Sequence, residues 1–138
     1  MDMIKLDRLK ELSMYNGNFY WNTEPVTMDD IKLAISSNTE VETEEFGHEW
    51  AELEWSNERH IQRVVYFIKN PEKIDPINLD NIVNGNYITS IAHITDGNHR
   101  FFALCYLDTQ SIPCKYGGRE DVLDYLSGVS DIVPEDFY

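Results

Sequence analysis

Apolar residues in the first third of the chain recur mostly with helical spacing. Three leucines fall on one face of a helix predicted over residues 6–14. A second helix is predicted after Thr27, because this residue and the acids that follow it are typical of a helix N-terminus. Its apolar face consists of Ile31, Ala34 and Ile35. Between the two helices, Asn16-Gly17 lies among aromatic residues, which predicts either a hairpin or a glycine that ends the first helix.

The strongest helical pattern begins after Ser56 or Asn57, either of which can cap a helix. Apolar residues recur there every three or four positions, at Ile61, Val64, Val65 and Ile68. Asn70-Pro71 ends this helix, because the residue before a proline disfavours the helical conformation. Residues 51–55 alternate as in a half-buried strand, but their composition suits a helix equally well.

Strands and helices alternate in the C-terminal half. Ile77-Asn78-Leu79 is a short predicted strand, and the β-branched run from Tyr87 to Ile94 predicts a strand covered on both sides. After Asp96-Gly97, residues 101–107 are apolar nearly all round, which indicates a buried helix. A strand over residues 112–116 follows, expected at an edge or an end of the sheet because it contains Pro113. A last helix contains Val122, Leu123 and Leu126 and is closed by Gly128.

Composition indicates one folded domain over residues 1–138. Hydrophobic residues make up 42% of the chain, and no apolar run approaches the ~20 residues that a membrane span needs. The N-terminus carries charges where a signal peptide has its apolar stretch, so a cytoplasmic protein is expected. The two cysteines, Cys105 and Cys114, lie in apolar surroundings without the spacing of a zinc site and are expected to be buried.

The charge balance is strongly acidic, with 11 basic and 25 acidic residues and a net charge of −14. Direct binding to DNA is unlikely, because such a field repels phosphates, although one local positive pocket remains compatible with it. Glutamates gather in one band, which predicts a solvated acidic face or a surface for a basic protein partner. The band comprises Glu40, Glu42, Glu44, Glu45, Glu49, Glu52 and Glu54. His48 beside these glutamates is a weak candidate for a metal ligand.

The stretch most suggestive of chemistry is Asp96-Gly97-Asn98-His99-Arg100. A strand that leads through glycine into a helix N-terminus presents unpaired N–H groups to an anion. Arg100 can donate two hydrogen bonds to a phosphate, His99 can donate a proton, and Asp96 can hold Mg²⁺ or orient a nucleophile. Lys115 on the next strand can reach a phosphate, or protect a sheet edge. The alternative is an ordinary turn with Asn98 as the N-cap and Arg100 paired with a carboxylate.

With its flanking elements, this loop resembles the ParB-N/sulfiredoxin superfamily. The resemblance covers residues 58–128, with Ile74 to Leu79 like a Pro-linked strand of the family, the D-G-x-H-R loop, and Ile112-Pro113-Cys114 like its later strand. Residues 1–57 resemble no family. The resemblance implies an α+β fold, a small mixed sheet with packed helices, in which the loop binds nucleotide phosphates. It implies phosphate-binding roles for Gly97, Asn98, His99 and Arg100, and a catalytic or metal-orienting role for Asp96.

Departures from the family limit the expected activity. Asn98 stands where sulfiredoxins have their reactive cysteine, so reduction of a sulfinic acid is excluded. A histidine often begins the corresponding helix in this family, so His60 is a candidate to face the loop, although a surface or core-edge position is the expectation. Trp21 and Trp55 are expected among core or interface aromatics.

Three functions follow from this reading of the sequence, and the least favoured of them, because of the charge, is an accessory protein in DNA processing. The first is a nucleotide-binding protein, an ATP-dependent phosphotransferase or ATPase that takes ATP or another nucleotide with Mg²⁺. The second is a non-catalytic acidic binding or inhibitor protein on the same fold, in which the glutamate band docks a basic partner.

Overall fold

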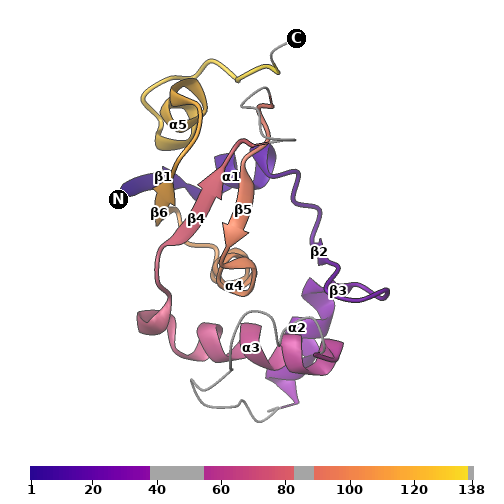
Figure 1. Ribbon diagram of the computed structural model, residues 1–138. Helices are drawn as coiled ribbons and strands as arrows, with labels where there is room; N and C mark the ends of the chain where they lie inside the picture. The colour runs from indigo at the N-terminus through magenta and orange to yellow at the C-terminus, as the bar shows by residue number, and fades with distance from the viewer. Residues whose placement is uncertain (38–54, 83–88, 137–138) are drawn as a thin grey trace.

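The computed structural model describes residues 1–37, 55–82 and 89–136. Within these ranges the chain has an α+β fold, with five α-helices, a mixed four-stranded sheet and a small hairpin (Figure 1). The helices are α1 (Leu6–Leu12), α2 (Met28–Ser36), α3 (Asn57–Lys69), α4 (Asn98–Leu107) and α5 (Glu120–Ser127), with a 3₁₀ turn, η2 (Pro71–Lys73), after α3. The strands are β1 (Asp2–Lys5), β2 (Asn18–Phe19), β3 (Val26–Thr27), β4 (Ile77–Asp80), β5 (His93–Asp96) and β6 (Ser111–Tyr116).

The four-stranded sheet has the order β1-β6-β4-β5. Strand β6 runs antiparallel to β1 and parallel to β4, while β4 pairs antiparallel with β5. Because β5 is an edge strand that leads directly into α4, the β5–α4 junction lies at one side of the sheet, where other elements can approach it.

Helix α4 lies between two hydrophobic cores. Phe101, Leu104 and Cys105 belong to the core that the sheet forms with α1 and α5. Phe102 and Ala103 belong to a second core with α2 and α3. Figure 1 shows α4 between the sheet and α3. This position explains why the helix is apolar nearly all round, and it confirms the prediction that the helix is buried.

The predicted helices form close to their expected bounds because local signals define their ends. The Thr27 hydroxyl accepts from the Asp30 N–H at 3.1 Å and the Asp30 carboxylate accepts from the Thr27 N–H at 2.9 Å, which together form a reciprocal capping box at the predicted helix start. Ser56 caps α3 by accepting from the Arg59 N–H at 3.3 Å. Gly128 closes α5 in the left-handed conformation. None of the helices within the described residues is long and apolar enough to cross a lipid bilayer.

The hairpin predicted across Asn16-Gly17 is wrong. Ser13 follows the last residue of α1, and Gly17 adopts a φ of +88° without ending that helix. The strand after the glycine, β2, pairs instead with β3, so the connection runs through residues 20–25. Aromatic residues on both sides of a turn therefore pack here without forming a ladder: the rings of Tyr15 and Phe19 lie 6.0 Å apart.

The predicted strand from Tyr87 to Ile94 is also wrong in its bounds. Residues 83–88 lie outside the described part of the chain, and the observed strand β5 begins only at His93. Ahead of it, the Ala92 N–H donates to the Leu12 carbonyl at 3.1 Å, a contact with α1 rather than with a neighbouring strand. Thr95 is exposed, so β5 is not covered on both sides as expected.

Strand β6 lies inside the sheet, although Pro113 predicted an edge or an end. Pro113 pairs with Met3 of β1, but the pairing with β4 begins one residue later, at Cys114 opposite Ile77. Proline therefore has a partner strand on one side only, which is locally equivalent to an edge and makes its missing N–H tolerable. Cys105 and Cys114 are both buried free thiols, as expected.

Candidate functional site

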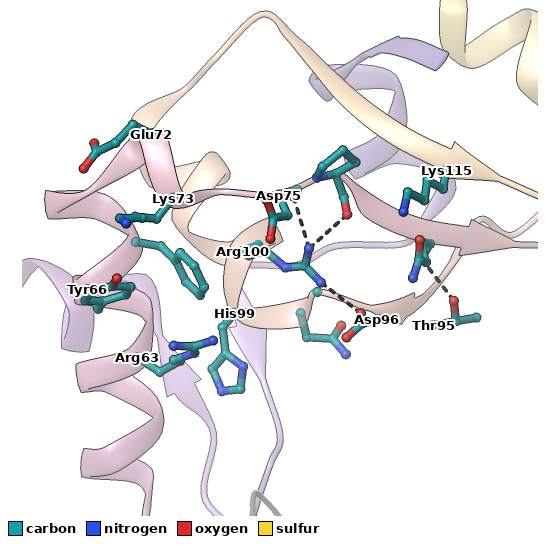
Figure 2. A pocket seen from close by; sticks show the side chains of 15 residues that line it. Arg63, Tyr66, Glu72, Lys73, Asp75, Thr95, Asp96, His99, Arg100 and Lys115 are labelled. Carbon is teal, nitrogen blue, oxygen red and sulfur yellow. Dashed lines mark hydrogen bonds and ion pairs between the residues drawn. The ribbon is translucent and has the colours of Figure 1, made fainter. Parts of the chain in front are cut away.

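The loop from Asp96 to Arg100 forms one wall of an open pocket of about 820 Å³. Helix α3 and η2 provide the facing wall, and β4 and β6 contribute to the side nearest the sheet (Figure 2). All six residues that the sequence singled out line this pocket. They are Asp96, Gly97, Asn98, His99, Arg100 and Lys115. Tertiary structure thus gathers the predicted loop and the predicted lysine around one volume.

Gly97 is required by the geometry at the start of α4. Its φ of +104° and ψ of +29° lie in the left-handed region, and a Cβ atom there would be 2.8 Å from Ile77 Cγ2 and 3.0 Å from Arg100 Nη2. The N-cap of α4 is Gly97 and not Asn98, so the expectation of Asn98 as an ordinary cap is wrong. Glycine has no side chain with which to cap the helix, so no N-cap side chain hydrogen-bonds to the first turn of α4.

Arg100 holds the loop together. Its Nη1 donates to the carbonyls of Pro76 at 2.9 Å and Asp75 at 3.2 Å, and its Nη2 pairs with the Asp96 carboxylate at 3.0 Å. Only 14% of the Arg100 side chain is exposed, whereas 46% of the Asp96 side chain is. The pairing with a carboxylate that the sequence left as an alternative is therefore observed, and it ties the segment before β4 to the first turn of α4 (Figure 2).

His99 is linked to a second buried histidine. His60 of α3 is fully buried, and its Nδ1 lies 2.9 Å from His99 Nε2. Trp21 covers both imidazoles, with ring centroids 4.6 Å from His60 and 4.5 Å from His99 and interplanar angles of 9° and 7°. The expectation of a surface or core-edge position for His60 is wrong, because the ring is enclosed between α4, the Trp21 indole and Trp55.

Burial keeps the His99 ring neutral. The pKa of His99 falls from its ordinary value of 6.5 to about 3, first because the ring is desolvated and then because His60, Arg63 and Arg100 add positive charge nearby. A neutral imidazole carries one donor and one acceptor nitrogen, so at neutral pH His99 offers a hydrogen bond rather than a charge. It is thus poorly suited to act as a strong acid, whereas a fixed neutral donor or acceptor is compatible with its surroundings.

Sequence reasoning missed two basic residues of the pocket, Arg63 and Lys73. Arg63 lies on α3 one turn after His60, and its guanidinium stacks on the Phe67 ring at 4.5 Å from the centroid. The spacing of three residues between His60 and Arg63 was the available signal, since it places both on neighbouring parts of one helix face. Lys73 lies in η2, which links α3 to the β4 segment, and had no comparable signal.

A metal site is supported only weakly by this arrangement. Within the described residues, no group of three or more histidine, cysteine, aspartate or glutamate side chains is arranged to hold a metal ion. Mg²⁺ is commonly held by one or two carboxylates together with substrate phosphates, so Asp96 fits a metal that arrives with its ligand. The glutamate band and His48 lie outside the described residues, so the prediction of a docking surface there stays a prediction.

Comparison of the chain with protein-family models, curated proteins and solved structures finds no match. The resemblance to the ParB-N/sulfiredoxin superfamily therefore stays a prediction that depends on the loop and the order of its flanking elements.

Proposed function

We propose that the chain binds the phosphate groups of a nucleotide in the pocket beside the Asp96–Arg100 loop. The observation that carries the proposal is the distribution of charge. Of the residues that the structure describes, four of the 11 basic ones line this pocket, namely Arg63, Lys73, Arg100 and Lys115, but only three of the 18 acidic ones (25 less the seven glutamates of the band), Glu72, Asp75 and Asp96. Four minus three gives the described lining a formal charge of +1, in a chain whose full sequence has a net charge of −14. A local positive site in an acidic protein is typical of selective anion binding.

The backbone supports the same ligand. Helix α4 is ten residues long and begins in the pocket wall, so its dipole favours an anion beside its first turn. In Figure 2, Lys73 and Lys115 lie on opposite sides of the Arg100 guanidinium. Both lysines are exposed and both line the pocket, so their ammonium groups can approach an extended polyphosphate from its two ends.

Asp96 and Arg100 are proposed to act as one unit. With the ion pair closed, Arg100 orders the loop and neutralises Asp96. A bound phosphate competes for the Arg100 guanidinium, which releases the Asp96 carboxylate to face an accompanying Mg²⁺ or an attacking hydroxyl. This is the simplest way in which the loop serves an ATP-dependent phosphotransferase or ATPase, the activity suggested by the resemblance to the ParB-N/sulfiredoxin superfamily.

The decisive experiment is a ligand screen by thermal shift and calorimetry, with ATP, CTP, GTP and ADP in the presence of Mg²⁺. A ligand that binds only the folded state at about 100 times its Kd should raise the unfolding free energy by about 2.7 kcal/mol. Lys115→Ala removes one exposed pocket cation and should weaken binding about tenfold, since hydrogen bonds to charged groups contribute about 1.5–3 kcal/mol.

The matched control is Lys32→Ala, which removes an exposed lysine of α2 that does not line the pocket. The control should bind as the wild type does. Equal weakening in both variants would indicate a general charge effect rather than a site. If no nucleotide shifts the wild type, the loop is architectural, and the glutamate band with a basic protein partner becomes the function to test.

A further inference from the structure

The buried His60 and His99 rings are joined by a direct contact between two ring nitrogens. The two ring centroids lie 5.1 Å apart and the ring planes differ by 15°, while the bonded nitrogens are 2.9 Å apart. Two five-membered rings reach this separation when they lie edge to edge with the bonded nitrogens between their centroids. The contact is therefore a hydrogen bond in the common plane of the rings and not a face-to-face stack.

Trp21 holds the two rings in that plane. Its indole is parallel to both imidazoles within 9° and lies at nearly equal distances from them. The indole comes from the connection between β2 and β3, in the part of the chain for which the sequence suggested no family. Rotation of either ring out of the plane would lose this stacking and the nitrogen–nitrogen bond together.

The bond occupies one nitrogen of His99. His99 lines the pocket and His60 does not. Nε2 is directed at the buried partner, and Nδ1 is the other nitrogen of the ring. One proton lies in the bond between the two ring nitrogens, and the ring that donates it determines what Nδ1 of His99 carries. If His60 donates that proton, His99 keeps a hydrogen on Nδ1 and is a donor. If His99 donates it, Nδ1 is an acceptor and repels an anion.

We propose that His60 is a positioning residue whose Nδ1–H donates to His99 Nε2, so that His99 presents a neutral Nδ1–H donor to the phosphate. This inference rests on the proposed function, because an anionic ligand in a positively charged pocket needs a donor at that position. His60 acts through His99 alone and does not touch the ligand. The pair thereby supplies a hydrogen bond of fixed direction without placing a further charge beside Arg63 and Arg100.

The first measurement needs no ligand and no variant beyond those used for assignment. Long-range ¹H–¹⁵N correlation spectra of the labelled protein distinguish the two neutral tautomers of each histidine. We expect His99 with its proton on Nδ1 and His60 also with its proton on Nδ1. A wild-type His99 with its proton on Nε2 overturns the inference outright.

The second measurement uses two substitutions and inorganic pyrophosphate as the probe. His60→Phe keeps an aromatic ring under Trp21 but removes the donor, so the His99 nitrogen shifts should change and pyrophosphate should bind about tenfold more weakly. His60→Gln retains an N–H that can donate to His99 Nε2, and we expect it to restore much of the affinity and the Nδ1–H tautomer. A merely structural role for His60 would not produce this selective rescue.

The two proposals fail in different ways. If the wild type binds pyrophosphate and His60→Phe binds it equally well, the inference about His60 is overturned while the proposed function stands. If the wild type binds neither pyrophosphate nor any nucleotide, the proposed function is wrong, and so is the ligand-facing role of His99. Should His60→Phe fail to fold, the wild-type tautomer and the His60→Gln affinity still decide the inference.

Discussion

Replacing Gly97 by alanine tests the geometry of the loop independently of any ligand. The substitution meets two obstacles in the structure, a φ of +104° and a Cβ position 2.8 Å from the Ile77 side chain. A left-handed conformation costs a non-glycine residue about 1–2 kcal/mol. Forcing an extra carbon into a packed site costs about 1–3 kcal/mol more. Alanine also lowers the conformational entropy of the unfolded chain, which stabilises the folded state by about 0.4–1 kcal/mol. We therefore expect Gly97→Ala to lower the free energy of unfolding by about 2–4 kcal/mol.

Two other glycines separate these contributions. Gly17 has a φ of +88° but no atom within 4 Å of an added Cβ, so Gly17→Ala carries the backbone cost alone and should lose about 1 kcal/mol. At Gly117 an added Cβ meets nothing within 4 Å and φ is not in the left-handed range, so Gly117→Ala should be neutral or slightly stabilising.

Urea unfolding of the wild type and the three variants provides the measurement. The urea concentration at the unfolding midpoint should fall in the order Gly117→Ala, Gly17→Ala, Gly97→Ala. The slope of the unfolding free energy against urea concentration should be the same in all three variants. A Gly97→Ala variant no less stable than Gly17→Ala would refute the close approach of Gly97 to Ile77 and Arg100. The start of α4, and with it the proposed anion site, would then need a different geometry.

Three further predictions concern the surroundings of the site. The pKa of His99 is 6.5 when unfolded and about 3 when folded, so the unfolded chain binds the proton more tightly and stability falls as pH drops below 6.5. Between about pH 8 and about pH 5 the free energy of unfolding of the wild type should fall by about 2 kcal/mol more than that of His99→Gln, as measured by urea unfolding at each pH. An equal fall in both proteins would show that the buried ring titrates normally. Thr27→Ala removes one half of the capping box of α2 and should cost about 1 kcal/mol by the same assay, whereas Thr27→Ser should retain most of the stability. The buried Asn81 side chain accepts from the Tyr116 hydroxyl and the Arg119 N–H and donates to the Ile91 carbonyl. Asn81→Leu should therefore lower the free energy of unfolding by about 2–4 kcal/mol and Tyr116→Phe by only about 1 kcal/mol. A Leu variant as stable as the Phe variant would contradict this network.

Local signals in the sequence were sufficient for the helices and for the central loop. The capping residues Thr27 and Ser56, the apolar spacing of α3 and the all-apolar α4 each depend on neighbours within one or two turns. Asp96-Gly97 likewise predicts a turn before a helix, because only glycine adopts the required left-handed conformation without strain. Features of this kind are visible in a few consecutive residues, so they could be predicted.

The pairing of distant segments was decided only by the tertiary structure. Nothing near Pro113 in the sequence shows that β4 begins to pair with β6 only at the next residue, Cys114. This late start is the reason why an inner strand tolerates a proline. The partner of His99 lies 39 residues away on another helix, and Trp21 lies farther still. Arg63 and Lys73 join the loop for the same reason, since α3 packs against α4 and places Arg63, and Lys73 of the following η2, in the facing wall. Residue types and periodicity specify which face of an element is buried, but only the packing of whole elements selects what that face meets.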